Sequence, residues 1–339
     1  MRLILIGFGT VGQGLAELLI EKQQELQNQY GLKTQVVGIS DMLKGSVYNP
    51  NGIDLQKCLE TAKAGGKISA LPDAFDGDAL SFIKKAEADM MVEATYTDIK
   101  TGEPATSHIR AALEKGMHVT TTNKGPLALN FLELSKIAKD KNVKFLYEGT
   151  VISGTPLLNL IRETLANSSI SEIKGILNGT TNYILTKMEE GLPYEDALKK
   201  AQELGYAEAV PDADVLGWDA LAKVTILANT VFGFKSKPDD FPCKGITDIT
   251  ADAIKDAKAR GKRFKLIGKV WRDGDKVKGS VAPEEIDMTH PLAGIMGATN
   301  AVTMTTKPLG DVTIVGPGAG RTETGYSALI DIIHVGGLK

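Results

Sequence analysis

The sequence predicts an α/β protein of two parts: an N-terminal doubly wound parallel sheet, followed by an α+β domain with a mixed sheet. Three observations predict this fold class. The chain opens with a short apolar strand, a glycine turn and a helix. Apolar strands and helices then alternate up to about residue 150, after which helices precede a series of strands. The length of 339 residues suits two domains that each bury a core.

Strands and helices alternate through the first 150 residues. Residues 3–6 form an apolar strand, residues 11 to about 28 a helix and residues 34–39 a second strand that ends at Asp41. Glycines and proline predict a looser insertion over residues 44–71, with one helix near 55–64. Further helices are expected at 79–85, 107–115 and 127–139, and further strands at 90–94, 118–121 and 144–147. This order is typical of a parallel sheet with crossover helices.

The pattern changes after Gly149. Helices are expected at residues 155–165, 180–190, 194–204, 217–232 and 251–260, and strands at 170–177, 263–271, 276–281, 301–306 and 311–315. Turn residues separate the late strands, which predicts a mostly antiparallel or mixed sheet. The last segment, residues 316–338, reads as a glycine-rich loop followed by a helix over 322–333.

The composition is that of an ordinary soluble protein, with 42% hydrophobic and 24% charged residues. A net charge of -3 gives no indication of a basic surface that would bind nucleic acid. Two cysteines and four scattered histidines form neither a disulfide framework nor a metal cluster. No apolar run reaches the length of a membrane span, and no signal peptide is evident. We therefore expect a cytoplasmic protein without a nucleic-acid or membrane partner.

The glycine turn has the pattern GxGxxG in the context that dinucleotide binding requires, between a strand and a helix. Its residues are Gly7, Phe8, Gly9, Thr10, Val11 and Gly12. The glycines would allow a tight turn, close approach of a pyrophosphate and close helix packing, which predicts a Rossmann-type domain. Asp41 would accept the ribose hydroxyls of NAD, whereas Lys44 or Lys57 could serve the phosphate of NADP. The choice between NAD and NADP stays open at this point.

Three polar loops follow. Lys124 comes after the strand at 118–121, at the carboxyl edge where such sheets place ligands. Residues 148–156 join the two parts, and their backbone oxygens could hold a cation or simply form a hinge. Residues 178–182, NGTTN, exceed what helix capping needs and suggest a loop that faces a ligand.

The run from Gly205 to Lys223 is rich in charge and changes from loop to helix. If it is helical from Val215 onward, Asp219 and Lys223 share one face because they are four residues apart. An exposed ion pair worth about 0.3 to 0.5 kcal/mol is the ordinary interpretation of such a spacing. The alternative is a binding surface with one amine beside it.

Taken together, these segments resemble homoserine dehydrogenase in its short form, without the regulatory ACT domain. The matching pieces are GFGTVG, TTNKGP, YEGTV, KGILNGTTNYIL, GYAEAVPDADVLGWDALAK and GPGAGRTETG, in the family's order over nearly the whole chain. The resemblance implies NAD- or NADP-dependent interconversion of L-homoserine and L-aspartate 4-semialdehyde. It also implies a homodimer or a dimer of dimers.

The resemblance also implies roles for individual residues. Lys223 would donate the proton, with Lys124 as its competitor and as a residue of the substrate and nicotinamide region. The substrate would be bound by Gly205, Glu208, Asp214, Asp219, Asn178 and Thr180. Beyond the glycine turn and Asp41, the cofactor would contact Thr95, Lys124, Gly318 and Gly320. A sodium ion would be held by the backbones of Glu148, Val151, Ser153 and Thr155.

These roles define the expected domains: residues 1–150 bind the dinucleotide, 151–315 bind substrate and dimerise, and 316–339 return to the first domain. The chemistry supports Lys223 as the acid, because aldehyde reduction needs a proton donor and no histidine lies near these motifs. We expect Asp219, with Glu208, to anchor the substrate's ammonium group rather than to serve Lys223.

Two other functions can be weighed. A semialdehyde dehydrogenase that forms a thioester needs a nucleophilic cysteine, but Cys58 and Cys243 lie away from the glycine motifs. A nicotinamide-sensing regulator would need a basic DNA-reading helix, which this acidic chain does not offer.

Overall fold

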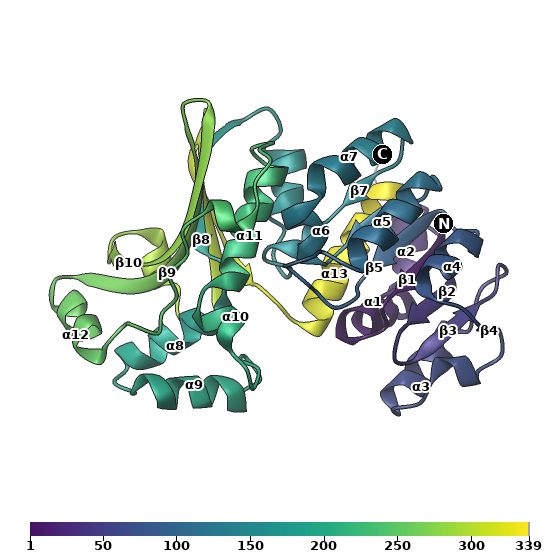
Figure 1. The fold of residues 1–339 in the computed structure, drawn as a ribbon, viewed down its shortest axis with the longest axis horizontal. Coiled ribbons are helices and arrows are strands. Elements are labelled where there is room, and N and C mark those ends of the chain that lie inside the picture. The colour runs from purple at the N-terminus through teal and green to yellow at the C-terminus, as the bar shows by residue number, and fades with distance from the viewer. Residues whose placement is uncertain (338–339) are drawn as a thin grey trace. The chain divides into compact units, whose positions relative to one another are not determined.

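The computed structural model describes residues 1–337, which form two compact units (Figure 1). The first unit comprises Met1–Gly154 together with the segment that begins at Gly320. The second unit is Thr155–Ala319. The chain therefore leaves the first unit once, builds the second, and returns with its last helix.

The first unit contains a seven-stranded sheet in the order β4-β3-β2-β1-β5-β6-β7. Its strands are β1 (Arg2–Ile6), β2 (Gln35–Asp41), β3 (Gly45–Tyr48), β4 (Ala74–Phe75), β5 (Met90–Glu93), β6 (His118–Thr121) and β7 (Phe145–Leu146). The five strands other than β3 and β4 pair in parallel, which confirms the predicted class. β3 and β4 add an antiparallel edge. The sequence did not predict this edge, because these strands are short and lie in a segment rich in turn residues.

Eight α-helices of the first unit are described: α1 (Thr10–Glu21), α2 (Gln23–Tyr30), α3 (Leu55–Lys63), α4 (Ala79–Lys85), α5 (Ala105–Glu114), α6 (Lys124–Leu129), α7 (Phe131–Asp140) and α13 (Arg321–Gly336). Two predicted helices are each divided. The helix expected at 11–28 breaks at Lys22, and the helix expected at 127–139 starts at Lys124 and breaks at Asn130. The earlier start matters for the site, because it places Lys124 in the first turn of α6.

The sheet of the first unit has a hydrophobic core on each face. Leu3 and Leu5 of β1 pack with α1, α3 and α13, whereas Ile4 and Ile6 pack with α4, α5 and α7. Alternate side chains of a strand point to opposite faces, so a continuous apolar strand serves both cores. The all-apolar residues 3–6 are thus explained by burial on two sides.

The last helix, α13, lies against α1 although more than 300 residues separate them, as the yellow helix beside the purple one in Figure 1 shows. Two glycines permit the close contact. A Cβ atom on Gly325 would lie 2.7 Å from the Leu15 nitrogen, and one on Gly14 would lie 2.3 Å from the Arg321 oxygen. The Arg321 guanidinium also donates to Glu17 of α1 at 2.9 and 3.1 Å. α13 therefore completes the core of the first unit.

The second unit contains a five-stranded sheet in the order β10-β9-β8-β11-β12. Its strands are β8 (Ser169–Ile176), β9 (Lys262–Asp273), β10 (Lys276–Asp287), β11 (Thr299–Lys307) and β12 (Gly310–Pro317). Every pairing of these strands is antiparallel, the first of the two expected forms. The α-helices of this unit are α8 (Gly179–Glu189), α9 (Tyr194–Glu203), α10 (Asp212–Val215), α11 (Trp218–Thr230) and α12 (Ala251–Ala259).

Two predicted elements of the second unit differ in the structure. The expected helix at 155–165 is irregular at its start and continues as a π-helical segment over Leu160–Thr164. Helix does not run on from Val215 either, because Gly217 takes a φ of 85° and separates α10 from α11. A left-handed residue of this kind ends one helix and lets the next begin in a new direction.

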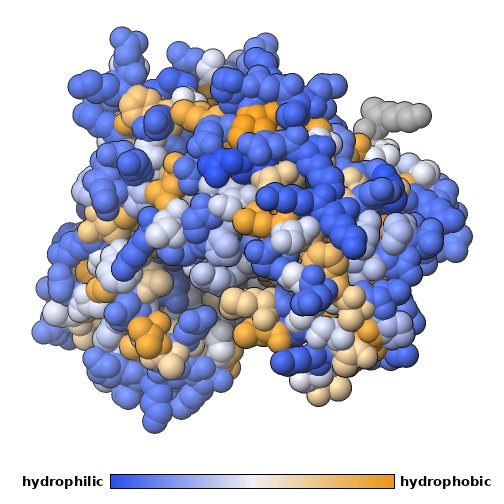
Figure 2. Space-filling view, turned by 45° about the vertical axis from the view of Figure 1, so that its right-hand side comes forward, coloured by the Kyte–Doolittle hydropathy of each residue, from blue (hydrophilic) through white to orange (hydrophobic). Residues whose placement is uncertain are grey.

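None of the helices within residues 1–337 has both the length and the apolar character that crossing a membrane requires. The face of the molecule in Figure 2 is mainly hydrophilic, with hydrophobic residues scattered over it in small groups.

Candidate functional site

The glycine turn of the first unit has the geometry of a dinucleotide cradle. Gly7 has a φ of 93°, and a Cβ atom there would lie 2.4 Å from the Ala94 oxygen. A Cβ atom on Gly12 would lie 2.4 Å from the Gly7 oxygen, whereas nothing lies within 4 Å of the corresponding position on Gly9. Gly7 and Gly12 are thus required for packing, and Gly9 leaves open space at the N-terminus of α1. This arrangement fits a pyrophosphate.

A cavity of about 730 Å³ lies at this turn. Its lining includes Gly7 and Gly9 from the turn, Asp41 from the end of β2, and Thr95 from the segment after β5. These are residues for which the sequence predicts cofactor contacts. They come from neighbouring parallel strands, whose carboxyl ends share one edge of the sheet, the position where such folds bind nucleotides.

Asp41 connects the rim of the cavity to the glycine turn. Its Oδ2 accepts a hydrogen bond from the Phe8 N–H at 2.7 Å, and its Oδ1 accepts from the N–H groups of Leu43 and Lys44 at 3.0 and 2.9 Å. A carboxylate offers about four acceptor positions, so one remains for a ribose hydroxyl. Lys44 also lines the cavity. Lys57 lies on the exposed surface of α3.

The segments after β5 and β6 lie next to each other. The Asn123 side chain donates to the Tyr96 oxygen at 2.8 Å, and its Oδ1 accepts from the Gly125 N–H at 3.1 Å. Asn123 thereby caps α6, whose first residue is Lys124. Both Thr95 and Lys124 are therefore held at the carboxyl edge of the sheet, at positions fixed by hydrogen bonds.

Glu93 is a residue of this region that was not predicted from the sequence. Its carboxyl group is fully buried at the end of β5, and burial raises its pKa, while hydrogen bonds from Thr95 and Thr121 oppose that shift. An acidic residue at the end of an apolar strand was the available signal, since charged side chains are rarely buried.

The segment that is expected to bind sodium, residues 148–155, is held by hydrogen bonds to later parts of the chain. The Glu148 N–H donates to Asp331 of α13 at 3.1 Å, and the hydroxyl groups of Ser153 and Thr324 are 2.8 Å apart. Val151 is buried in the same unit, whereas Thr155 begins the second unit and donates to the Pro317 oxygen at 2.9 Å. The sodium assignment stays a prediction.

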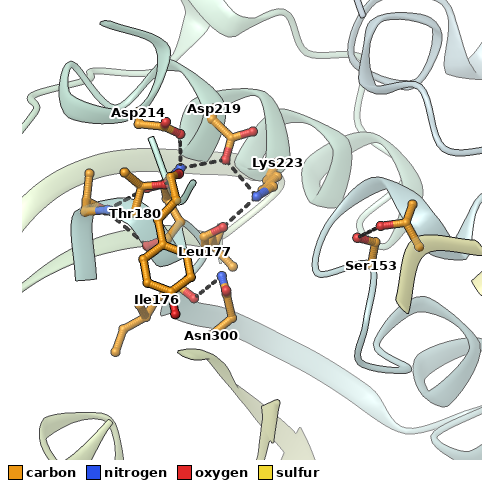
Figure 3. Close-up of polar contacts among 12 residues, drawn as sticks. Ser153, Ile176, Leu177, Thr180, Asp214, Asp219, Lys223 and Asn300 are labelled. Carbon is orange, nitrogen blue, oxygen red and sulfur yellow. Dashed lines mark hydrogen bonds and ion pairs between the residues drawn. The ribbon is translucent and has the colours of Figure 1, made fainter. Parts of the chain in front are cut away.

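In the second unit, the residues expected to bind substrate form a connected polar cluster (Figure 3). The Asn178 amide donates to Asp214 at 2.6 Å and to Asp219 at 3.0 Å. The Lys223 ammonium donates to Asp219 at 2.7 Å and to the Leu177 oxygen at 2.7 Å. Asn178 also caps α8 by accepting from the Thr181 N–H. Residues of α10 and α11 therefore meet the two residues, Leu177 and Asn178, that connect β8 to α8.

This cluster is partly enclosed. The side chains of Lys223 and Asp219 are 10% and 16% exposed. The cluster contains the two carboxylates of Asp214 and Asp219 and the single ammonium group of Lys223, so it can bind a further cationic group, such as the ammonium of an amino acid. The interpretation of Asp219 and Lys223 as an exposed surface pair is therefore wrong. The structure also joins the two side chains directly, although the sequence predicts separate tasks for them.

The remaining predicted substrate residues lie in the loop between α9 and α10 or beside it. Gly205 has a φ of 74°, Glu208 is exposed, and the Thr180 hydroxyl donates to the Tyr206 oxygen at 2.5 Å. Thr180 thus ties α8 to this loop. The exposed Glu208 carboxylate faces solvent.

Asn300 of β11 is a second residue that was not predicted from the sequence. Its side chain donates to the Ile176 oxygen at 2.9 Å, one residue before the Leu177 oxygen that accepts from Lys223. A Cβ atom on Gly318 would lie 2.0 Å from the Asn300 side chain, so Gly318 is required for this contact. Gly320, with a φ of 142°, precedes α13. Their expected contacts with the cofactor stay predictions.

Comparisons with known proteins match both halves of the chain. Residues 7–148 match the family described as the NAD binding domain of homoserine dehydrogenase, and residues 156–333 match the family described as homoserine dehydrogenase. The chain is 47% identical over 337 residues to an NAD(+)-dependent homoserine dehydrogenase of Pseudomonas canavaninivorans, covering 98% of this chain and 96% of that one. It is 42% identical to a homoserine dehydrogenase of Methanocaldococcus jannaschii, covering 99% and 98%. A solved hyperthermophilic archaeal homoserine dehydrogenase in complex with NADPH has a TM-score of 0.84 and 30% identity, covering 98% and 97%.

Proposed function

The chain belongs to the homoserine dehydrogenase family, whose members are NAD(P)-dependent oxidoreductases that act on a CH–OH group, and from this premise we propose the details of its reaction. The protein interconverts L-homoserine and L-aspartate 4-semialdehyde in the cytoplasm, in the aspartate-derived pathway to threonine, methionine and isoleucine. The buried Lys223 ammonium, held between Asp219 and the Leu177 oxygen, is the observation that carries the proposed mechanism.

The acidic residues of the cluster, together with Glu208 of the loop between α9 and α10, hold the amino end of the substrate. Homoserine carries an ammonium group, and the carboxylates of Glu208, Asp214 and Asp219 supply the opposite charge. A charge-assisted hydrogen bond to a carboxylate is about twice as strong as a neutral one. Asn178 keeps Asp214 and Asp219 together, since its amide donates to both.

Lys223 moves the proton of the reacting hydroxyl group. A dinucleotide bound at the glycine turn would supply the hydride acceptor for the oxidation of homoserine. In that direction Lys223 would act in its unprotonated amine form, and its Nζ atom would take the proton of the reacting hydroxyl group. In the reverse direction, the lysine ammonium gives a proton to the oxygen of the aldehyde as the hydride arrives. The hydrogen bonds to Asp219 and to the Leu177 oxygen fix the Nζ atom for this transfer. Lys124 is the second candidate for the proton donor.

The dinucleotide is held by the glycine turn and by Asp41. We propose that NAD is preferred over NADP, because a carboxylate at the end of β2 accepts ribose hydroxyls and repels a phosphate at the same position. Lys44 on the same rim is the group that would work against this preference. The 47% identical relative bears the name NAD(+)-dependent homoserine dehydrogenase, which supports the same choice.

A monovalent cation and a dimer complete the proposal. Sodium would bind backbone oxygens of residues 148–155, and replacing sodium by choline in the assay would then lower activity. A homodimer or a dimer of dimers would appear as a multiple of the 36.2 kDa chain mass in light scattering.

One spectrophotometric experiment tests the proposed reaction. The purified protein is given L-homoserine with NAD or NADP in a buffer without phosphate, and formation of the reduced nicotinamide is followed by its absorbance. We expect turnover with homoserine. The alternative outcome is no activity with homoserine but oxidation of L-aspartate 4-semialdehyde when phosphate is added. That outcome would make the protein a semialdehyde dehydrogenase.

A further inference from the structure

Glu93 is a fully buried carboxyl group at the carboxyl end of β5. No lysine or arginine within residues 1–337 forms an ion pair with it. Its two oxygens instead accept from three donors: the Thr95 N–H at 3.1 Å, the Thr95 hydroxyl, and the Thr121 hydroxyl at 2.8 Å. Burying a carboxyl group without a cation costs free energy of folding, which suggests that the hydrogen bonds of Glu93 serve a function.

These contacts connect the ends of two neighbouring strands. Glu93 and Thr121 are partners in the register of β5 and β6. The Thr121 hydroxyl oxygen also accepts from the Asn123 N–H at 3.0 Å, and Asn123 in turn reaches the Tyr96 oxygen and caps α6. One carboxyl group thus fixes both Thr95 and the segment that carries Lys124.

The same contacts border the cavity. Thr95 and the adjacent Ala94 both line it, and the Ala94 oxygen is the atom that a Cβ on Gly7 would strike at 2.4 Å. β1 lies between β2 and β5 in the sheet, so the Glu93 region and Asp41 lie on opposite sides of the glycine turn. If Asp41 binds the ribose of the adenosine half, the nicotinamide half extends toward β5 and β6.

We propose that Glu93 is a positioning residue for the nicotinamide half of the dinucleotide. It acts through Thr95 and through the Asn123–Lys124 segment, which it holds beside the glycine turn. The inference rests on the proposed dinucleotide site but not on the identity of the substrate. A displacement of about 1 Å at such a site can cost on the order of 100-fold in rate, so a positioning role has a measurable effect.

The test is ligand affinity measured without catalysis. The dissociation constants of NADH and of ADP-ribose, which lacks the nicotinamide, are determined by titration for the parent protein, Glu93→Ala, Glu93→Gln and the control Glu114→Gln. Glu114 is exposed at the end of α5. We expect Glu93→Ala to weaken NADH binding about tenfold or more while ADP-ribose binding changes by less than about threefold.

The Glu93→Gln variant is expected to restore NADH binding. Its amide oxygen can accept from Thr95 and its NH₂ group can donate to the Thr121 oxygen, so NADH binding should return to within about threefold of the parent. A general folding defect would weaken both ligands equally and lower the melting temperature, and that result would overturn the proposal. So would a Glu93→Ala protein that binds NADH normally.

If Glu93→Ala does not fold, the Glu93→Asp variant tests the proposal in its place. Its carboxylate is one methylene shorter and cannot reach both threonines as before, so NADH should bind at least about threefold more weakly, with ADP-ribose unaffected. Unchanged NADH affinity in a folded Glu93→Asp protein contradicts the inference. A parent protein that binds NADH but does not oxidise homoserine would defeat the proposed function alone.

Discussion

The Lys223 ammonium donates a hydrogen bond to Asp219 Oδ2 at 2.7 Å, one turn away on α11, and both side chains are largely buried. An exposed pair at this spacing would contribute little to stability or function. Here the same Asp219 oxygen also accepts from Asn178, and the same ammonium reaches the Leu177 oxygen. The pair is therefore the centre of a cluster that joins α11 to the connection between β8 and α8.

Replacing Lys223 by alanine tests the proposed proton donor. We expect Lys223→Ala to lower kcat about 100-fold or more and to leave the dissociation constant of NADH unchanged, because the proposed dinucleotide contacts are those of the glycine turn and Asp41. Steady-state kinetics and NADH titration measure the two effects. Lys199→Ala, at an exposed position of α9, is the matched control. Near-normal turnover of Lys223→Ala would move the role to Lys124.

Asp219→Asn tests what the carboxylate contributes to the cluster. The substitution keeps the shape but removes the charge partner of a buried ammonium, so we expect the free energy of unfolding to fall by about 1 to 3 kcal/mol and kcat to fall as well. Urea denaturation provides the stability measurement. Asp212→Asn, on the exposed side of α10, should change neither quantity. Equal stability of Asp219→Asn and the parent would show that the pair is energetically unimportant.

Glu208→Gln tests the role of an exposed carboxylate in substrate binding. The variant loses charge but keeps a hydrogen-bond acceptor, so the KM for homoserine should rise about tenfold while kcat changes much less. Glu203→Gln, at the exposed end of α9, is the control. If KM stays at the parent value, Glu208 does not hold the ammonium group.

Asp41→Asn tests the basis of cofactor choice. The amide retains one acceptor oxygen for the neighbouring N–H groups but no longer repels a phosphate. The ratio of kcat/KM for NAD to that for NADP should therefore fall about tenfold. Measuring both cofactors in parallel with the parent gives this ratio. A parent protein that already prefers NADP, or a ratio that the substitution leaves unchanged, would refute the assignment.

Lys265 gives the protein a predicted pH dependence. This lysine is buried on β9, with hydrogen bonds to the Asn182 side chain and to the Ile295 oxygen, and burial lowers its pKa to about 8. The unfolded chain, with a lysine pKa near 10.4, then binds more protons than the folded chain between pH 8 and 10.4. The contribution of Lys265 to stability should therefore be least favourable below pH 8 and should rise through this window.

The measurement is the free energy of unfolding of the parent minus that of Lys265→Met, compared at pH 7 and at pH 9.5. We expect this difference to increase in favour of the parent by about 1 to 2 kcal/mol at the higher pH. Other titrating groups are common to both proteins and cancel in the difference. A pH-independent difference would mean that the lysine titrates normally in the fold.

Local patterns in the sequence were sufficient for most elements of the fold. The apolar residues 3–6 and the GFGTVG turn predict β1, the cradle and the start of α1, because each depends on neighbours in the chain. The same patterns failed where a single residue interrupts a helix. One helix ends and the next begins at Lys22, Asn130 and Gly217, where the backbone of that one residue leaves the helical conformation.

The sequence by itself determined the fold class, the glycine cradle and the family, because these rest on residue order and on short motifs. It also supplied the members of the polar cluster, but not their partners. Only the tertiary structure decided that Asp219 joins Lys223 to Asn178, that the Leu177 oxygen receives the ammonium, and that the buried Glu93 links the ends of β5 and β6. The physical reason is that burial and hydrogen-bond geometry depend on segments far apart in the chain, and a charged residue's role is set by what surrounds it.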